Sequence, residues 1–142
     1  MPMKIALAET ETDIARCNPV MVELRPHLSA TEFAARVRKQ QVAGFQLAYL
    51  EEAGEVRAVA GFRYLETLGW GKILYVDDLV AAPAQRSRGH GGKLFNWLVA
   101  QAKQNNCDEF HLDSGVQRFG AHRFYLTRRM DIICHHFALK LK

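Results

Sequence analysis

The chain has 142 residues, of which 49% are hydrophobic and 24% are charged, and its net charge is +4. This length suits a single domain spanning residues 1–142 and is too short for two separate cores. The composition excludes disordered, collagen-like and coiled-coil chains. No apolar run approaches the roughly 18 residues needed to cross a bilayer, and the N-terminus lacks the apolar stretch of a signal peptide. We therefore expect a cytoplasmic protein without a membrane partner.

The first third of the chain predicts a strand followed by helices. Lys4–Ala8 is a short strand, and Thr10 with Asp13 has the spacing of a capping box that begins a helix. Asn18 followed by Pro19 resembles an N-cap and first helical position. We expect the first helix to break there and restart.

The second helix begins at Ser29, which repeats the capping-box spacing with Glu32, and ends near Gly44. The pattern then changes to apolar, β-branched runs, which predict a hairpin and a third strand over residues 45–50, 56–65 and 73–80. The remaining elements are a helix, a strand, a helix and a long closing strand over residues 91–106, 109–113, 119–130 and 132–141. The order βααβββαβαβ predicts an α/β (α+β) fold with a mixed, mostly antiparallel central sheet and helices on both faces.

Cysteines and histidines give no metal site. Cys17, Cys107 and Cys134 are widely spaced and form no CxxC pair, which is typical of reduced thiols. His111 and Asp113 share a strand face, but two ligands are too few for a metal, so we predict none. In the closing strand, His135 shares a face with Ile133, Phe137 and Leu139, which favours a packed core histidine over a catalytic base.

The most informative stretch is VDDLVAAPAQRSRGHGGKL, from Val76 to Leu94. Glycines at a helix entrance let a ligand approach the backbone, where unpaired amides and the positive dipole end favour phosphate. Arg86 and Arg88 add positive charge. The Walker A and dinucleotide-binding spacings both fit badly. A glycine-rich helix start without a ligand is the alternative.

Residues 86–91, RSRGHG, resemble the signature of the GNAT superfamily of acyl-CoA-dependent N-acyltransferases: Gln or Arg, two residues, Gly, one residue, then Gly or Ala. The match lies between a strand with acidic residues and a long helix. The resemblance extends over nearly the whole chain in element order and length. It implies acetyl-CoA as cosubstrate and no metal.

The resemblance also assigns cofactor contacts. The strand before the loop is expected to hydrogen-bond the pantetheine arm, and one of its N–H groups is expected to polarise the thioester carbonyl. The loop amides are expected to cradle the pyrophosphate. These cofactor-binding residues are Leu79, Val80, Ala81, Arg86, Ser87, Arg88, Gly89, His90, Gly91 and Gly92.

A tyrosine follows in the family pattern Ala, three residues, Tyr, three residues, Gly, Phe. Ala121 and Tyr125 match it, and the family role is to protonate the departing thiolate. Arg118 stands where Asn is usual and is a hypothetical phosphate contact or an exposed helix arginine. Arg129 and Met130 stand in place of Gly and Phe.

Asp77 and Asp78 are the candidate catalytic groups on the acceptor side. A primary amine has a pKa of about 10.4, so its attack at neutral pH needs a route for proton removal. Adjacent strand residues face opposite ways unless a bulge turns one of them. Acidic pairs here resemble those of polyamine-type family members. A solvent-facing carboxylate is the alternative.

These residues predict an N-acetyltransferase that passes acetyl from acetyl-CoA directly to a small-molecule or peptide primary amine, with a lean toward a cationic one from Asp77, Asp78 and Glu66. A catalytically silent acyl-CoA sensor is the alternative that Arg129 motivates. Nucleic-acid binding is a third reading and rests on Arg118, Arg123, Arg128 and Arg129. Family members often form dimers, so a homodimer is compatible with the resemblance. The sequence leaves the acceptor and the oligomeric state open.

Overall fold

The computed structural model describes residues 2–83 and 88–142 and divides into two compact units, Met1–His111 and Leu112–Lys142. Each unit is described by itself. Along the chain the elements are β1 (Met3–Leu7), α1 (Glu11–Met21), α2 (Ala30–Val42), β2 (Gln46–Glu52), β3 (Glu55–Thr67), β4 (Gly71–Ala81), α3 (His90–Gln104), β5 (Glu109–Leu112) and α4 (Phe119–Thr127). In the part of the chain described, no helix combines the length and apolarity needed to span a membrane.

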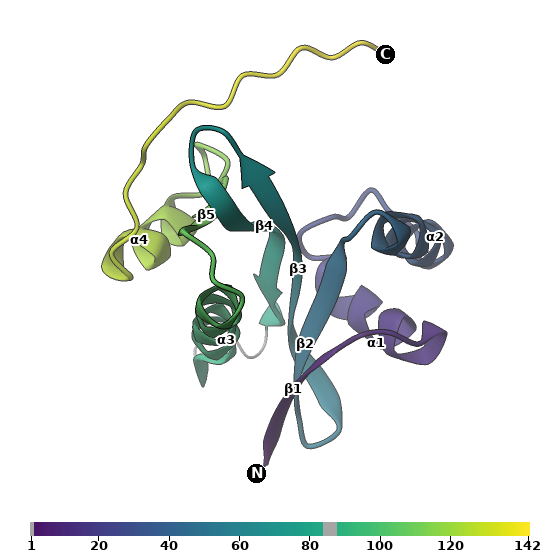
Figure 1. Cartoon of the computed structure of the whole chain (residues 1–142). Coiled ribbons are helices and arrows are strands. Elements are labelled where there is room, and N and C mark those ends of the chain that lie inside the picture. Colours follow the sequence, from purple (N-terminus) through teal and green to yellow (C-terminus); the bar gives the residue numbers. More distant parts are fainter. Residues whose placement is uncertain (1, 84–87) are drawn as a thin grey trace. The chain divides into compact units, whose positions relative to one another are not determined.

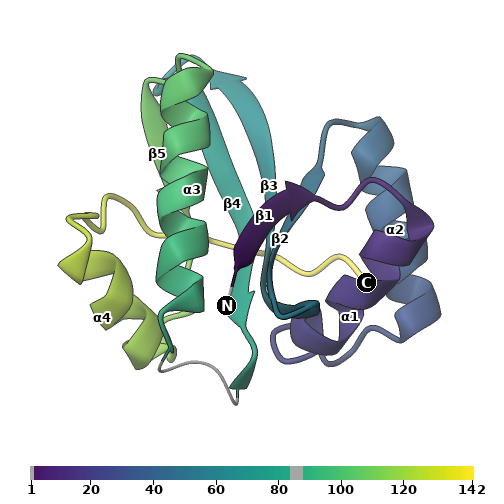
Figure 2. The same ribbon diagram turned by 90° about the horizontal axis from the view of Figure 1, so that it is seen from below.

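The five strands form one sheet in the order β1-β2-β3-β4-β5. The pairings from β1 to β4 are antiparallel, and the sheet as a whole is mixed and mostly antiparallel. Helices α1 and α2 cover one face and α3 covers the other (Figures 1 and 2). The predicted fold class is confirmed.

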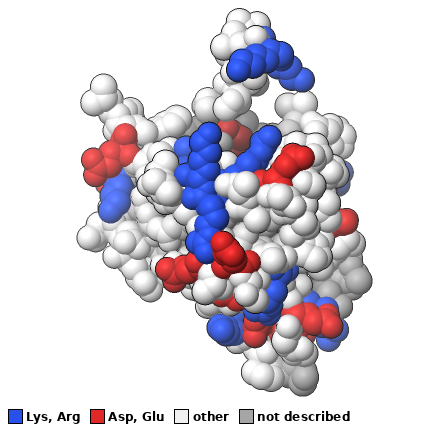
Figure 3. Space-filling view, turned by 90° about the vertical axis from the view of Figure 1, so that its right-hand side faces the viewer, with Lys and Arg blue, Asp and Glu red and all other residues white. Residues whose placement is uncertain are grey.

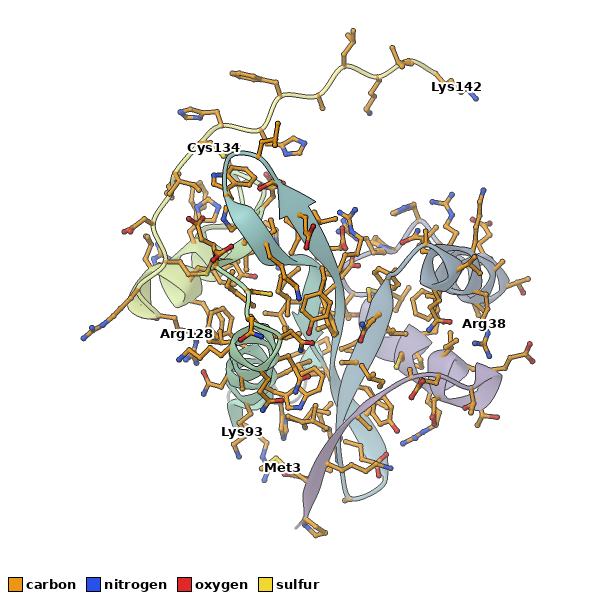
Figure 4. All side chains as sticks on the ribbon, viewed as in Figure 1. Met3, Arg38, Lys93, Arg128, Cys134 and Lys142 are labelled. Carbon is orange, nitrogen blue, oxygen red and sulfur yellow. The ribbon has the colours of Figure 1, made fainter. Side chains whose placement is uncertain are left out.

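Each face of the sheet has its own buried contacts. On the α1 and α2 side, Ile14, Phe33 and Leu47 belong to one apolar cluster. On the α3 side, Leu94 and Leu98 are fully buried. Burial of each such side chain contributes about 1.5–3 kcal/mol, so both helical layers hold the sheet. At the edge, Lys93 Nζ of α3 lies 3.6 Å from Met3 Sδ of β1 (Figure 4).

The predicted N-caps of α1 and α2, Thr10 and Ser29, are confirmed. Thr10 Oγ1 accepts a hydrogen bond from the Asp13 amide at 3.1 Å, and Ser29 Oγ accepts one from the Glu32 amide at 3.1 Å. Acidic residues in both first turns complement the helix dipole. These two helices therefore satisfy part of their own N-terminal amides.

The expected break at Asn18 and Pro19 is wrong, because α1 runs through Pro19 to Met21. Proline removes one hydrogen bond to the carbonyl four residues earlier. Here it lies in the last turn, and Val20 and Met21 still bury their side chains in the core. Tertiary packing therefore outweighs the local signal.

The expected closing strand 132–141 is also absent, since residues 131–142 form neither helix nor strand. Figure 1 draws this segment as an extended stretch after α4. His135, which we expected in the core, is exposed, and so is His136. An alternating pattern identifies a segment able to pair, but a strand forms only where another strand supplies its hydrogen bonds.

Candidate active site

A β-bulge in β4 places the two adjacent aspartates. Gly61 of β3 pairs with Asp78 and the next residue, Phe62, pairs with Val76, so Asp77 is the extra residue. Phe62 faces α3, where its ring packs edge-on against Trp97 at 6.1 Å between centroids. Its neighbours Gly61 and Arg63 therefore face the α1 and α2 side.

Asp77 is held by a bidentate ion pair. Arg63 donates from Nε to Oδ2 and from Nη2 to Oδ1, both at 2.8 Å. Because Arg63 faces the α1 and α2 side, its partner carboxylate is drawn to that side too. Such forked pairs fix geometry as well as charge.

Asp78 is held from a different element. Arg25, in the turn after α1, donates from Nε to Asp78 Oδ1 at 2.8 Å and from Nη2 to the Asp77 carbonyl at 3.1 Å. The bulge thus brings both carboxylates to the same face. From the sequence, we expected the two aspartates to share a face only if a bulge turned one of them.

The side chain of Asp78 is less exposed to solvent than that of Asp77. Its side chain is 14% exposed, against 26% for Asp77. Burial raises the pKa of Asp78, and the hydrogen bond from Arg25 offsets this only in part. Among the described residues, none donates a hydrogen bond to Asp78 Oδ2. Within the described residues, this oxygen is therefore an acceptor without a donor on a partly buried carboxyl group.

Gly61 makes room for this carboxylate. A Cβ at Gly61 would lie 2.7 Å from Asp78 Oδ2 and 2.5 Å from Phe45 Cζ, closer than real Cβ atoms approach their neighbours. The absence of a side chain at residue 61 is what lets Asp78 and Phe45 meet across β3.

The other chemical feature is the start of α3, which follows the end of β4. Its N-cap is Gly89, in the left-handed region at φ 78°, and it makes no side-chain cap. The first turn contains no acidic residue, in contrast to α1 and α2. Within the described residues, these first-turn amides lack the capping oxygen that the other two helices have. They suit an external anion.

The remaining loop residues fall into three groups. Gly89 and Arg88 are exposed, and nothing lies within 4 Å of where a Gly89 Cβ would be. His90 is buried, with Nε2 3.6 Å from Glu52 Oε2, so only its backbone is left for a ligand. Arg86 and Ser87 lie outside the described residues.

The first turn of α3 packs on the end of β4. A Cβ at Gly91 would lie 3.8 Å from Ala81 Cβ, an ordinary contact distance. Leu79, Val80 and Ala81 pair with β3. On the other side, the Asp108 amide donates to the Lys72 carbonyl at 2.7 Å, so the four-residue β5 begins beside the start of β4. β5 spans only about 13 Å, so β4 continues beyond it.

Comparison with known proteins decides the family. Residues 7–130 match the model of the acetyltransferase (GNAT) family. The chain belongs to this family. It is 32% identical over 115 residues, covering 80% of this chain and 81% of the relative, to the uncharacterized N-acetyltransferase YhdJ of Bacillus subtilis (strain 168).

Solved GNAT structures share the fold. A ribosomal-protein-alanine N-acetyltransferase from Brucella melitensis biovar Abortus 2308 aligns with a TM-score of 0.84 at 14% identity, covering 99% of this chain and all of that one. An aminoglycoside N-acetyltransferase, AAC(6')-Iy, in complex with CoA aligns with a TM-score of 0.84 at 12% identity, covering 98% of this chain and 94% of that one. GNAT proteins use acetyl-CoA.

Tyr125, which the sequence predicts to be the proton donor, lies in the second unit. Tyr125 is on α4, its ring 5.4 Å from that of Phe124. Burial raises the pKa of Tyr125, while the charge of Arg118 lowers it by a smaller amount. Arg118 is the exposed N-cap of α4. The phenol is therefore protonated at neutral pH.

The departure from the GNAT pattern at Arg129 changes the residue but not the helix end. Arg129 adopts φ 67°, the left-handed conformation that glycine favours. Its amide donates to the Leu126 carbonyl at 3.1 Å, and the Met130 amide donates to the Tyr125 carbonyl at 3.2 Å. These are the two bonds of a Schellman motif. Because Arg129 leaves the helix end intact, it no longer favours the alternative of a catalytically silent acyl-CoA sensor.

Sequence reasoning missed three residues of the site: Arg25, Arg63 and Gly61. Arg25 and Asp78 are 53 residues apart, and no local spacing connects them. Arg63 and Asp77 are 14 residues apart across the hairpin. A register of β3 against β4 could have paired them, but the bulge shifts that register by one residue.

Proposed function

We propose that the chain is an N-acetyltransferase that transfers acetyl from acetyl-CoA directly to a primary amine. The observation that carries the proposal is the start of α3, where a glycine N-cap and an acid-free first turn follow the end of β4. Backbone amides of residues 86–92 would hold the pyrophosphate, with Gly89 allowing close approach. The sequence match and the family membership support the same ligand.

The end of β4 is the proposed place for the thioester. Leu79, Val80 and Ala81 would hydrogen-bond the pantetheine arm through their backbone, and one N–H would stabilise the charge that develops on the carbonyl oxygen. Asp78 lies three residues before Ala81, about 10 Å along the strand. Its carboxylate would therefore lie on the same strand as the proposed thioester, and an amine bound between the two would reach it directly or through water.

The proposed reaction needs two proton transfers. The neutral amine nitrogen attacks the thioester carbon, and Asp78 Oδ2 takes a proton from the nitrogen and then releases it to solvent. The carbon–sulfur bond breaks, and Tyr125 gives its phenolic proton to the departing thiolate and regains one from solvent. No covalent enzyme intermediate is needed. Burial raises the pKa of Cys107, which disfavours its nucleophilic thiolate.

The charge of the aspartate pair bears on the acceptor. Asp77 and Asp78 are each paired with an arginine, so these four side chains are formally neutral. This pair therefore gives no support to the expectation that the acceptor carries additional positive charge. On the face that carries α1 and α2, basic and acidic side chains are interspersed rather than gathered into a basic stripe (Figure 3).

A screen of amine acceptors tests the proposal. The protein is incubated with acetyl-CoA and, in turn, amino acids, polyamines, aminoglycosides and peptides, with thiol release as the readout and mass spectrometry of the acceptor as confirmation. We expect one class to give thiol release together with an acceptor heavier by one acetyl group. Binding of acetyl-CoA without release for any amine would instead establish the sensor.

A further inference from the structure

The site around Asp78 presents two opposite charges at a short separation. At one end is Asp78 Oδ2, which lies against Gly61 of β3, 2.7 Å from where a Cβ at residue 61 would be. At the other end is Arg63, on the same face of β3 and two residues further on, which is about 7 Å along the strand. A small molecule that lies between them meets a carboxylate oxygen at one end and a guanidinium group at the other.

Arg63 uses only one edge of its guanidinium group. Its Nε and Nη2 atoms donate to the two oxygens of Asp77. A guanidinium group has five N–H donors, so Nη1 and the second hydrogen of Nη2 form another edge, here called the outer edge. None of the described residues accepts a hydrogen bond from Arg63 Nη1, and the side chain is 40% exposed. A second carboxylate can therefore bind the outer edge through two parallel hydrogen bonds.

The outer edge is oriented before any ligand binds. The two hydrogen bonds to Asp77 fix the plane of the guanidinium group. The ring of Tyr75, the residue opposite Arg63 in the pairing of β3 with β4, lies 5.3 Å from Arg63 Cζ, within the range of a cation–π contact. A donor pair that is already held in place loses less side-chain entropy when a ligand binds.

Arg25 is placed differently from Arg63. It donates to Asp78 Oδ1, the oxygen on the other side of the carboxyl group from Oδ2, and to the Asp77 carbonyl. Its own amide donates to the Met21 carbonyl at 2.9 Å, which ties its turn to the end of α1. Arg25 therefore orients Asp78, and Arg63 is the arginine on the side of Oδ2.

The charges of the cluster favour a ligand that carries both signs. The two aspartates and the two arginines have no net charge together. A polyamine would add only positive charge, whereas a free amino acid adds one charge of each sign. The spacing agrees, because a hydrogen bond of about 2.8 Å at each end and the two bonds between the amine nitrogen and the carboxyl carbon of an amino acid together span the separation.

We propose that the acceptor is a free amino acid, with its amino group facing Asp78 Oδ2 and its carboxylate bound to the outer edge of Arg63. The inference rests on the proposed function and narrows its acceptor. It excludes polyamines, peptide N-termini and the lysine side chains of proteins, because none of these carries a carboxylate two bonds from the amine.

The reaction keeps the proton transfers given above. The amine nitrogen bonds to the acetyl carbon, the carbon–sulfur bond breaks, and one amine proton leaves through Asp78. Tyr125 supplies the proton of the thiol. The products are an N-acetylamino acid and CoA.

The first test compares acceptors that differ in the carboxylate and needs no variant. The protein is assayed with acetyl-CoA and, in turn, the common amino acids, their carboxamides and their decarboxylated amines, with thiol release as the readout. We expect kcat/KM for the best amino acid to exceed that for its carboxamide by about 30-fold, the effect of hydrogen bonds between charged groups.

The outcomes of this comparison separate the inference from the proposed function. A carboxamide, a decarboxylated amine or a polyamine that is acetylated as fast as the best amino acid overturns the inference and leaves the proposed function standing. Absence of thiol release with every acceptor contradicts the proposed function, and the inference with it.

The second test asks whether Arg63 is the source of the preference. Arg16→Gln is the matched control for Arg63→Gln, since Arg16 is 33% exposed, pairs with Glu51 at 2.7 Å and lies 5.4 Å from the ring of Tyr49. We expect Arg63→Gln to reduce the amino acid to carboxamide ratio of kcat/KM to about threefold or less, and Arg16→Gln to keep the wild-type ratio.

A ratio of two acceptors does not depend on how much of the protein is folded, so a merely structural role of Arg63 would leave it unchanged. A wild-type ratio for Arg63→Gln, or equal losses in the two variants, overturns the inference. If Arg63→Gln does not fold, Arg63→Lys takes its place. It keeps the positive charge but lacks a second edge, so the ratio should fall about tenfold, and a wild-type ratio would again overturn the inference.

Discussion

The two units of the chain each contain a helix with large apolar side chains, and the results are opposite. In residues 2–111, α3 buries Leu94 and Leu98 completely on the sheet. In residues 112–142, α4 presents Phe119 and Leu126 and buries neither. The difference lies in what the chain supplies opposite each pattern. An apolar stripe becomes core only where a second surface faces it.

The largest expected effect tests this difference by truncating one leucine in each unit. Leu98→Ala should lower the free energy of unfolding by about 2–5 kcal/mol, because it opens a cavity at a fully buried position. Leu139→Ala, at a side chain 83% exposed, should change it by less than about 0.5 kcal/mol in dilute protein. Urea titrations at about 1 μM measure both. Equal losses would mean that the second unit has a core of its own.

The next prediction compares the two proposed catalytic groups, one from each unit. Asp78→Asn and Tyr125→Phe should each lower kcat by about 100-fold or more, the range of general acid and base catalysis, with little change in acetyl-CoA affinity. Steady-state kinetics and calorimetry separate the two quantities. If only one variant loses turnover, the other residue has no part in proton transfer.

The pH profile sharpens the role of Asp78. A base must be ionised, so kcat/KM should fall as the pH drops through the raised pKa of Asp78. Arg25→Gln removes the largest influence that lowers this pKa, so the acidic limb should move to higher pH. Arg63→Gln should move it less, because the charge of Arg63 is a smaller influence. An acidic limb at the same pH in all three proteins would rule out Asp78 as its source.

The smallest expected effect concerns the helix ends, where the units agree. Helices α2, α3 and α4 all end in a Schellman motif, with Gly44, Asn106 and Arg129 in the left-handed position. Arg129→Gly should therefore stabilise the chain by up to about 1 kcal/mol. Gly44→Arg should destabilise it by a similar amount. Thermal unfolding compares the pair, and destabilisation by Arg129→Gly would mean that the arginine side chain contributes more than its strain costs.

Local signals predicted most of the fold. Thr10, Ser29 and Gly44 marked helix ends because capping is a matter of adjacent residues, and the glycines after Arg88 marked the start of α3. The ion pairs of Asp77 and Asp78 could not be predicted from the sequence, because they depend on a bulge and on partners far along the chain. The predictions of a helix break at Pro19 and of a strand over residues 132–141 were wrong for a related reason. In both cases the surroundings, rather than the segment, determine the structure.

The most direct test of the account is calorimetric titration of acetyl-CoA into the protein and two glycine variants. Gly89→Glu places a negative side chain at the proposed pyrophosphate cradle. Gly54→Glu is its matched control, since Gly54 has φ +77° against +78° at Gly89, and nothing lies within 4 Å of either would-be Cβ. We predict unchanged affinity for Gly54→Glu and a loss of about 100-fold or more for Gly89→Glu. Undiminished binding by Gly89→Glu would contradict the placement of the cofactor at the start of α3.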